Sequence, residues 1–161
     1  MAKHRFPPIS PQDARKLRKC QRKALEAIAS WHEVGTEQTF LACMPTGTGK
    51  TGVIALSGLK LAQRDVLIVT PWDNLRTQMV EALESKFWSN SGIGKPDGFR
   101  AKAFAGKGLV DELNRGASDT TRTLWVTTFQ GLWTISRDRD PFAKLRAELD
   151  LVIIPKRRCG S

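Results

Sequence analysis

Met44-Pro45-Thr46-Gly47-Thr48-Gly49-Lys50-Thr51 is the segment that most strongly indicates the class of fold. An apolar run at residues 39–43 precedes it and predicts a strand, and a run at residues 52–56 follows it and predicts a helix. Gly47 and Gly49 allow a backbone approach that a Cβ would forbid, so successive N–H groups can point into one anion nest. The positive end of the following helix dipole acts at the same place. Strand, turn and helix in this order predict a phosphate-binding loop.

The loop departs at one position from the general pattern G-x-x-x-x-G-K-[ST], because Met44 stands where the first glycine is expected. In this pattern Lys50 reaches the β- and γ-phosphates, and the Thr51 hydroxyl is a ligand of Mg²⁺. The residues predicted to cradle the phosphates are Pro45, Thr46, Gly47, Thr48 and Gly49. The alternative is a Gly- and Thr-rich turn that precedes a helix by chance. Because both flanking elements are readable, we predict that the chain binds a nucleoside triphosphate.

The composition fits one soluble globular domain, since 161 residues with 40% apolar residues can bury a core. No run approaches the roughly 18 apolar residues of a membrane span, and the N-terminus has no apolar signal segment. A cytoplasmic location without a membrane partner is therefore expected. Cys20, Cys43 and Cys159 have no metal-type spacing and are interpreted as ordinary thiols.

The net charge of +10 indicates a polyanionic partner, with nucleic acid as the first candidate. A basic, solvated surface without such a partner is the alternative interpretation. Basic side chains crowd the first 25 residues against a single acid, Asp13, and they are Lys3, Arg5, Arg15, Lys16, Arg18, Lys19, Arg22 and Lys23. This distribution favours the nucleic-acid interpretation slightly.

A basic arm at residues 1–10 leads into a helix that we expect to run from Ser10-Pro11 to about residue 34. Ser10 can cap this helix, and Pro11 suits its first position. Gln21 falls on the apolar face. It can be a core glutamine whose amide is satisfied within the protein, or a glutamine that matches the donor and acceptor of an adenine edge.

Four further apolar runs predict strands at residues 65–69, 101–105, 123–127 and 150–154. Helices are expected at residues 50–63, from Thr70-Pro71 to about 87, and at 109–115, 129–135 and 141–146. Continuous apolar runs are typical of strands buried on both faces of a parallel sheet. The alternation therefore predicts an α/β fold, a three-layer sandwich with a mostly parallel sheet flanked by helices.

These segments together resemble the first motor domain of a superfamily 2 helicase, and especially the type III restriction-enzyme helicase subunits. Residues 17–25, with Gln21, resemble the adenine-reading glutamine motif, and residues 44–51 resemble a phosphate loop whose first position is often not glycine. The resemblance implies a RecA-like domain over residues 11–154 with ATP and Mg²⁺ as cofactors. Lys50 and Thr51 are its implied catalytic residues, Thr51 its implied Mg²⁺ ligand, and Gln21 its implied adenine contact.

Two other segments resemble parts of the same family that contact the nucleic-acid backbone. Residues 70–78 match T-P-x-x-x-L-x-x-Q, although alone they would be interpreted as a Pro-initiated helix, and residues 127–132 match a second strand-contacting segment. The implied contact residues are Thr70, Pro71, Arg76, Gln78, Thr127, Thr128 and Gln130. Ligands gather at the carboxyl ends of strands in an open α/β sheet, so these segments and the loop should share one edge.

In the family resembled, the strand matching residues 151–154 leads into an Asp-Glu pair that holds Mg²⁺ and positions the attacking water. Here it leads into a basic tail at residues 155–161, with Lys156, Arg157 and Arg158 and no acid. We therefore expect a fragment of a helicase or translocase that moves on nucleic acid, DNA in preference to RNA. Its implied partner is a second motor domain or subunit.

The alternative is a stand-alone, non-catalytic nucleotide- and nucleic-acid-binding module, whose basic tail would bind a phosphate-bearing partner. A different phosphate-loop enzyme, such as a small kinase, is a third interpretation. The sequence contains no recognisable acceptor-substrate motif, which argues against that third class.

Overall fold

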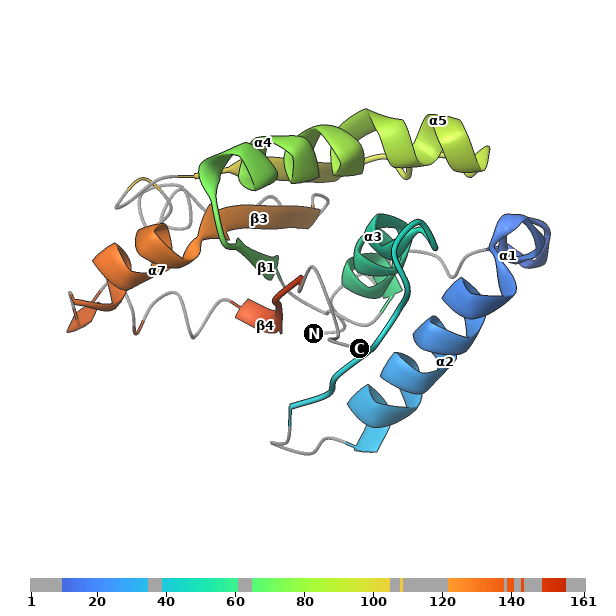
Figure 1. Ribbon diagram of the computed structural model, residues 1–161, viewed down its shortest axis with the longest axis horizontal. Helices are drawn as coiled ribbons and strands as arrows, with labels where there is room; N and C mark the ends of the chain where they lie inside the picture. The colour runs from blue at the N-terminus through green and yellow to red at the C-terminus, as the bar shows by residue number, and fades with distance from the viewer. Residues whose placement is uncertain are drawn as a thin grey trace.

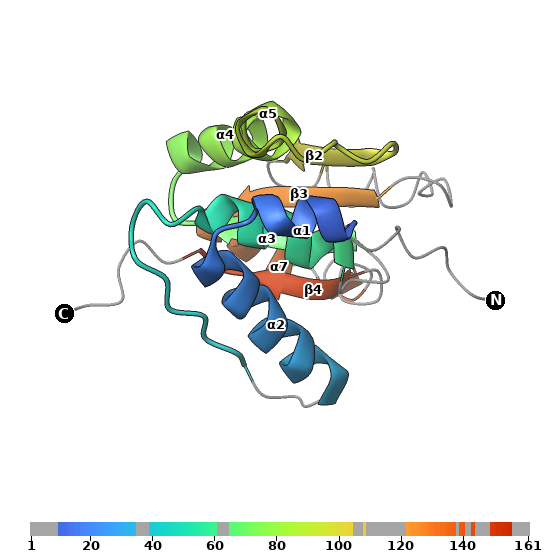
Figure 2. The same cartoon turned by 90° about the vertical axis from the view of Figure 1, so that its right-hand side faces the viewer.

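The computed structural model describes residues 10–34, 39–60, 65–104, 122–137 and 149–155, and the single positions 108, 139, 140 and 143. Residues 1–9 of the predicted arm, the helix predicted at residues 109–115 and residues 156–161 of the predicted tail lie outside these ranges. So does most of the helix predicted at residues 141–146. The described residues form a parallel sheet with helices on both faces (Figures 1 and 2). The predicted α/β fold class is therefore confirmed.

The sheet has four parallel strands in the order β2-β3-β1-β4. Their bounds are β1 Asp65–Thr70, β2 Phe99–Ala103, β3 Arg122–Thr128 and β4 Leu149–Ile153. β1 lies inside the sheet and is apolar over residues 66–69, and every residue from Val66 to Thr70 is buried. A strand covered on both faces needs such a continuous apolar run, which is why the sequence predicted it.

Two apolar cores lie on opposite faces of the sheet. On one face the α3 helix (Lys50–Lys60) packs Ala55, Leu56 and Leu59 against side chains of β1 and β3. On the other face the α7 helix (Phe129–Ser136) packs Ile135 against Leu67 and Val69 of β1 and their neighbours. Figure 2 shows α3 in front of the sheet and α7 behind it. Alternate residues of β1 thus serve the two cores in turn.

The helix predicted from residue 11 to residue 34 is interrupted, which corrects that prediction. The α1 helix (Pro11–Lys16) ends at Leu17, whose backbone is extended, and the α2 helix (Lys19–Val34) begins two residues later. Leu17 is buried in the core at the break. The Gln21 Oε1 accepts a hydrogen bond from the backbone N–H of Arg18 at 2.9 Å, so it serves one of the free N–H groups at the start of α2.

The start of α1 agrees with its prediction. Ser10 caps the helix, because its Oγ accepts a hydrogen bond from the Asp13 N–H at 3.0 Å, and Pro11 occupies the first helical position. Hydrogen bonds from Lys16 first and from the Ser10 hydroxyl second lower the pKa of the Asp13 carboxyl. The Lys16 ammonium also donates to the Gly92 carbonyl at 2.6 Å, which joins α1 to the end of the α5 helix (Phe87–Ser91).

The helix expected after Thr70-Pro71 begins later and changes its winding. The α4 helix (Asp73–Glu81) passes into a π-helical turn, η1 (Ala82–Lys86), and then into α5 (Phe87–Ser91), which ends at Gly92 with φ 65°. A π turn inserts extra backbone and rotates the face that follows it. Trp88 is consequently buried at 5% exposure, whereas the neighbouring Phe87 is only half-buried.

The strand predicted at residues 39–43 is absent, since residues 39–45 adopt no regular secondary structure. Their apolar character serves a different contact, because the Phe40 ring lies 5.7 Å from the ring of Trp31 on α2. The central strand β1 already has β3 and β4 on its two sides, and the described residues place no further strand beyond β4. The apolar run therefore has no strand beside it with which to pair.

Candidate functional site

The phosphate loop has the backbone shape that its two glycines predicted. Gly47 and Gly49 have φ values of 79° and 84°, in the left-handed region that other residues rarely adopt. The Thr48 hydroxyl donates a hydrogen bond to the Pro45 carbonyl at 2.7 Å and closes the turn. The α3 helix begins directly afterwards at Lys50, so the free N–H groups of its first turn lie beside the loop.

Three successive carbonyls of the loop are held by side chains from the start of α2. The Gly47 carbonyl accepts a hydrogen bond from Arg18 Nη1 at 2.6 Å, and the Gly49 carbonyl accepts one from Gln21 Nε2 at 3.0 Å. Between them, Cys20 Sγ lies 3.9 Å from the Thr48 carbonyl and donates weakly to it. We call Arg18, Cys20 and Gln21 the loop clamp.

The loop clamp determines where the N–H groups of the loop point. In a planar trans peptide the C=O and the N–H point in opposite directions. With the carbonyls of residues 47, 48 and 49 turned toward α2, the N–H groups of residues 48, 49 and 50 face away from it. Such a row of N–H groups at a helix N-terminus is a site for an anion.

Gln21 uses both ends of its amide inside the protein. It is 7% exposed, its Nε2 donates to the Gly49 carbonyl, and its Oε1 accepts from the Arg18 N–H. Of the two interpretations of this glutamine from the sequence, the core amide matches these contacts. Arg18 and Cys20 were not singled out as loop contacts, and their only signal was their position beside Gln21 at a predicted helix.

Gly49 and Gly52 are small because neighbouring side chains fill the space around them. A Cβ on Gly49 would lie 2.4 Å from Gln21 Nε2, and one on Gly52 would lie 2.5 Å from Phe87 Cε2. The loop and the first turn of α3 thus press against α2 on one side and α5 on the other. Any side chain at either position would displace the loop clamp or the aromatic ring.

Lys50 and Thr51 occupy the first two positions of α3 and are half-buried. The donor set fits a nucleotide phosphate, because it combines a row of N–H groups, a lysine and a hydroxyl at a helix N-terminus. No three His, Cys, Asp or Glu side chains cluster as metal ligands in the described part of the chain. A hydroxyl with few protein ligands is still compatible with Mg²⁺, which keeps several waters and binds phosphate oxygens.

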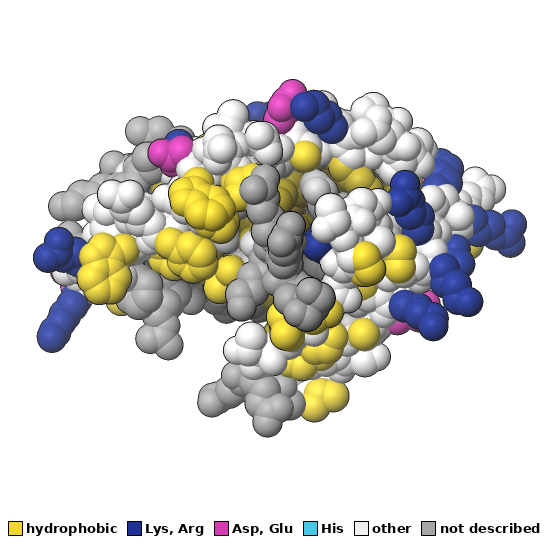
Figure 3. Space-filling model, viewed as in Figure 1, with side chains coloured by type: hydrophobic (Ala, Val, Ile, Leu, Met, Phe, Trp, Pro, Cys, Tyr) yellow, Lys and Arg dark blue, Asp and Glu magenta, His cyan; other side chains and the backbone are white. Residues whose placement is uncertain are grey.

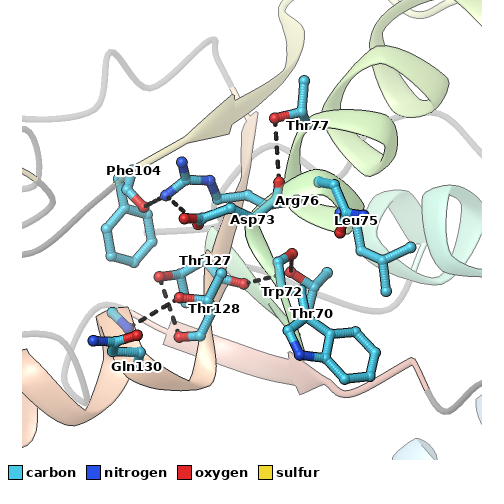
Figure 4. A network of polar contacts seen from close by, with 12 residues as sticks. Thr70, Trp72, Asp73, Leu75, Arg76, Thr77, Phe104, Thr127, Thr128 and Gln130 are labelled. Atoms are coloured by element: carbon cyan, nitrogen blue, oxygen red, sulfur yellow. Dashed lines mark hydrogen bonds and ion pairs between the residues drawn. The ribbon is translucent and has the colours of Figure 1, made fainter.

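The two segments predicted to contact nucleic acid meet at the carboxyl ends of β1 and β3 (Figure 4). Their threonines face inward: Thr70 is 1% exposed and Thr127 is fully buried. The Thr70 hydroxyl donates to the Thr127 carbonyl at 3.0 Å. The Thr128 hydroxyl accepts from the Gly131 N–H at 3.1 Å and thereby caps α7. The Thr70 hydroxyl thus links the ends of β1 and β3, and the Thr128 hydroxyl satisfies an N–H group in the first turn of α7.

The other predicted contact residues differ in exposure. Gln78 on α4 and Gln130 on α7 are exposed, and Pro71 is half-buried. Arg76 on α4 extends its side chain toward the end of β2 (Figure 4). Its Nη1 donates to the Phe104 carbonyl at 3.2 Å and lies 3.4 Å from Asp73 Oδ1. Its Nε is buried without a hydrogen-bond partner among the described residues.

Several aromatic side chains that the sequence did not predict lie exposed around these two segments, where hydrophobic side chains gather on the surface over α7 and the end of β1 (Figure 3). Trp72 follows β1 and is 62% exposed, and Phe129 and Trp133 on α7 are 48% and 66% exposed. The spacing of Phe129 and Trp133 places them on the same side of α7. Their exposure could not be predicted because helical periodicity alone does not say which face lacks a neighbour.

A parallel sheet, a clamped glycine-bearing loop and a helix that starts at its lysine define the RecA-like class of nucleotide-binding domain. Residues 14–154 match the family described as the type III restriction enzyme, res subunit, and the chain belongs to this family of ATP-dependent helicase domains. No curated protein and no solved structure matches the chain. None of the helices that the structure describes is long and apolar enough to cross a membrane.

Proposed function

We propose that this chain binds ATP with Mg²⁺ at the phosphate loop and forms the first motor domain of a DNA helicase or translocase. The single observation that carries the nucleotide site is the loop clamp, which turns three carbonyls of the loop toward α2. The triphosphate would accept hydrogen bonds from the N–H groups of residues 48–50. Lys50 would pair with the β- and γ-phosphates, and the Thr51 hydroxyl would be the protein ligand of Mg²⁺.

Family membership and charge support nucleic acid as the substrate of the motor. The net charge of +10 favours a polyanion, and the segments at residues 70–78 and 127–130 lie together at the carboxyl edge of the sheet. Because the threonine hydroxyls are used inside the protein, the exposed amides of Gln78 and Gln130 and the backbone N–H groups that begin α4 and α7 are the groups that would meet phosphate oxygens.

A non-catalytic nucleotide- and nucleic-acid-binding module is the second candidate. The observation that favours it is the sequence after β4, since residues 151–161 contain no Asp or Glu. ATP hydrolysis at a phosphate loop uses a carboxylate to hold Mg²⁺ and a polar group to orient water. Under this candidate the chain binds ATP and DNA without turnover.

Equilibrium binding of a fluorescent ATP analogue to the parent chain and to Lys50→Ala tests the nucleotide site. Loss of the ammonium should weaken binding at least tenfold, because it removes a direct charge partner of the phosphates. The matched control is Lys23→Ala, an exposed lysine on α2, which should bind like the parent. Unchanged affinity in Lys50→Ala would overturn the assignment. Phosphate release measured with and without DNA then distinguishes the motor from the binding module.

A further inference from the structure

Lysine and arginine side chains gather over α1 and the first turns of α2, on the right-hand side of Figure 3. Residues 10–23 contain six basic residues and a single acid, Asp13. Among the basic residues, Lys19, Arg22 and Lys23 are exposed on α2 and follow one another at spacings of three and four residues from Lys19. This spacing makes them neighbours on one face of the helix, and we call these three residues the basic surface. None of the ion pairs in the described part of the chain includes any of them.

The other basic side chains of this region have structural roles. Arg15 and Lys16 stand in the last turn of α1, where the negative end of the helix dipole stabilises a cation. Lys16 also pairs with Asp13 at 2.7 Å, and Arg18 donates to the Gly47 carbonyl of the phosphate loop. The fold therefore accounts for these three cations.

The fold does not account for the basic surface in the same way. Lys19 and Arg22 lie in the first turn of α2, which contains no acid, and the positive end of the helix dipole disfavours a cation there. Like charges three or four residues apart on a helix also repel each other. Arg22 makes one structural contact, because its Nη1 donates to the Leu17 carbonyl at 3.1 Å, but this bond leaves its positive charge uncompensated. The basic surface thus opposes the stability of the helix that carries it, and such local conflicts are expected at functional sites.

A polyanion of high charge density would remove this conflict. Duplex nucleic acid carries about one negative charge per 1.7 Å of its axis, twice the density of one of its strands. Proteins that bind single strands add aromatic side chains on which unpaired bases stack. Neither α1 nor α2, whose residues are all described, has an exposed aromatic side chain, whereas Phe129 and Trp133 are exposed on α7 at the other end of the molecule (Figure 1). The basic surface therefore has the chemistry for a duplex backbone and lacks the chemistry for unpaired bases.

We propose that the basic surface binds the phosphate backbone of a nucleic-acid duplex without reading its sequence. Lys19, Arg22 and Lys23 would donate to phosphate oxygens, and release of the counterions condensed on the duplex would drive binding. Another side of the same turn holds the phosphate loop through Arg18 and Gln21. α2 thus carries the nucleotide loop on one side and the duplex on the other. This contact is separate from those proposed at the carboxyl edge of the sheet and is tested independently of them.

The test measures binding of labelled short duplexes of DNA and RNA, and of the matching single DNA strand, by fluorescence anisotropy. The full 161-residue chain is compared with Lys19→Gln/Lys23→Gln, which removes two charges and keeps Arg22 in place. The matched control is Arg100→Gln/Lys102→Gln, which removes two charges from exposed residues of β2. We expect the α2 variant to bind a duplex at least tenfold more weakly than the parent, and the β2 variant to bind like the parent. The duplex that shows the loss, DNA or RNA, identifies the source of the phosphates.

Two further measurements distinguish a direct contact from an indirect effect. Each lost phosphate contact should reduce the slope of log K against log salt concentration by about 0.9, so the slope of the α2 variant should be about two units shallower and that of the β2 variant unchanged. The midpoint of urea unfolding should not fall in the α2 variant, because the two substitutions remove like charges from the beginning of a helix.

Several outcomes would overturn the proposal. They are equal duplex affinities of the two variants, an unchanged salt slope, a larger loss for the single strand than for either duplex, and a lower unfolding midpoint in the α2 variant. Polyglutamate that binds as tightly as the duplexes would also overturn it, in favour of an acidic protein. Each of these outcomes leaves the contacts proposed at the carboxyl edge untouched, since neither variant alters Gln78 or Gln130.

Discussion

The hydroxyl of Thr70 donates a hydrogen bond to the carbonyl oxygen of Thr127 over 3.0 Å, between the carboxyl ends of two neighbouring strands. Thr70 lies opposite Thr128 in the parallel ladder of β1 and β3. The Trp72 carbonyl also lies within reach of this hydroxyl, at 3.4 Å, but a hydroxyl has a single proton and the Thr127 carbonyl is the nearer acceptor. Thr70, which the family resemblance places at the nucleic-acid backbone, thus also links the ends of the two strands that lead into α4 and α7.

Replacing Thr70 by Val should destabilise the fold. The substitution keeps the shape of the side chain but leaves the buried Thr127 carbonyl without this donor, so the free energy of unfolding should fall by about 1–2 kcal/mol. Thr77→Val is the control, because the Thr77 hydroxyl bonds to the Asp73 carbonyl at 3.2 Å on an exposed helix surface. Urea unfolding measures both. Equal stability of the two variants would show that the buried bond contributes nothing.

Thr128→Ala should loosen the start of α7. The Thr128 Oγ1 accepts from the Gly131 N–H, and loss of such a cap costs about 1 kcal/mol. Thr128→Ser retains the hydroxyl and should recover most of this loss. Thermal unfolding and hydrogen exchange within residues 129–136 provide the measurement. A serine variant as unstable as the alanine variant would assign the effect to the threonine methyl group instead.

Alanine substitutions at the two loop glycines should differ from each other. Both positions have a positive φ, which costs a residue with a Cβ about 1–2 kcal/mol. The space differs, since a Cβ on Gly47 meets nothing within 4 Å, whereas a Cβ on Gly49 meets Gln21 Nε2 at 2.4 Å. Gly49→Ala should therefore be the more damaging, both to unfolding free energy and to ATP affinity.

A double-mutant cycle isolates the contact between Gly49 and the loop clamp. In a Gln21→Ala background the extra cost of Gly49→Ala over Gly47→Ala should largely vanish, because the amide that obstructs the new Cβ is gone. Additive effects of Gln21→Ala and Gly49→Ala would contradict this account.

Gln21→Ala alone separates the two interpretations of the glutamine. The variant loses a hydrogen bond to the loop and one to the start of α2, so it should bind ATP about tenfold more weakly and be less stable by about 1–3 kcal/mol. If Gln21 acts through the loop, GTP affinity falls in the same proportion, and this is the result we expect. A fall in the ratio of ATP to GTP affinity would instead show an adenine contact. Glu26→Ala, exposed on the same helix, is the control.

The two inner strands, β1 and β3, could be predicted from the sequence because they are buried on both faces. Residues 66–69 of β1 and 124–126 of β3 have none of the polar interruptions that an amphipathic helix would require. The structural bounds of β1, β3 and β4 differ from the predicted ones by one residue at most ends. The phosphate loop could be predicted for a different reason, because its backbone requires positive φ angles at the two glycines before Lys50.

The features that were missed depend on neighbours that are distant in sequence. An apolar run such as residues 39–43 indicates that its side chains are buried, but not whether a neighbouring strand pairs with it. Here Phe40 packs against Trp31 instead. The break at Leu17 follows from burial of that side chain, and the π turn leaves Trp88 more deeply buried than Phe87. In the site, the inward turn of Thr70 and Thr127 follows from strand pairing, which local sequence does not specify.

The order of the elements along the chain has a consequence for synthesis on the ribosome. The phosphate loop and α3 precede every strand that the structure describes. The edge strand β4 is the last of these strands along the chain. While the chain is being made from its N-terminus, the apolar face of α3 with Leu56 and Leu59 has no sheet to pack on. The nucleotide site is thus synthesised before the sheet that supports it, and the apolar face of α3 stays uncovered on the nascent chain until β1 and β3 have been made.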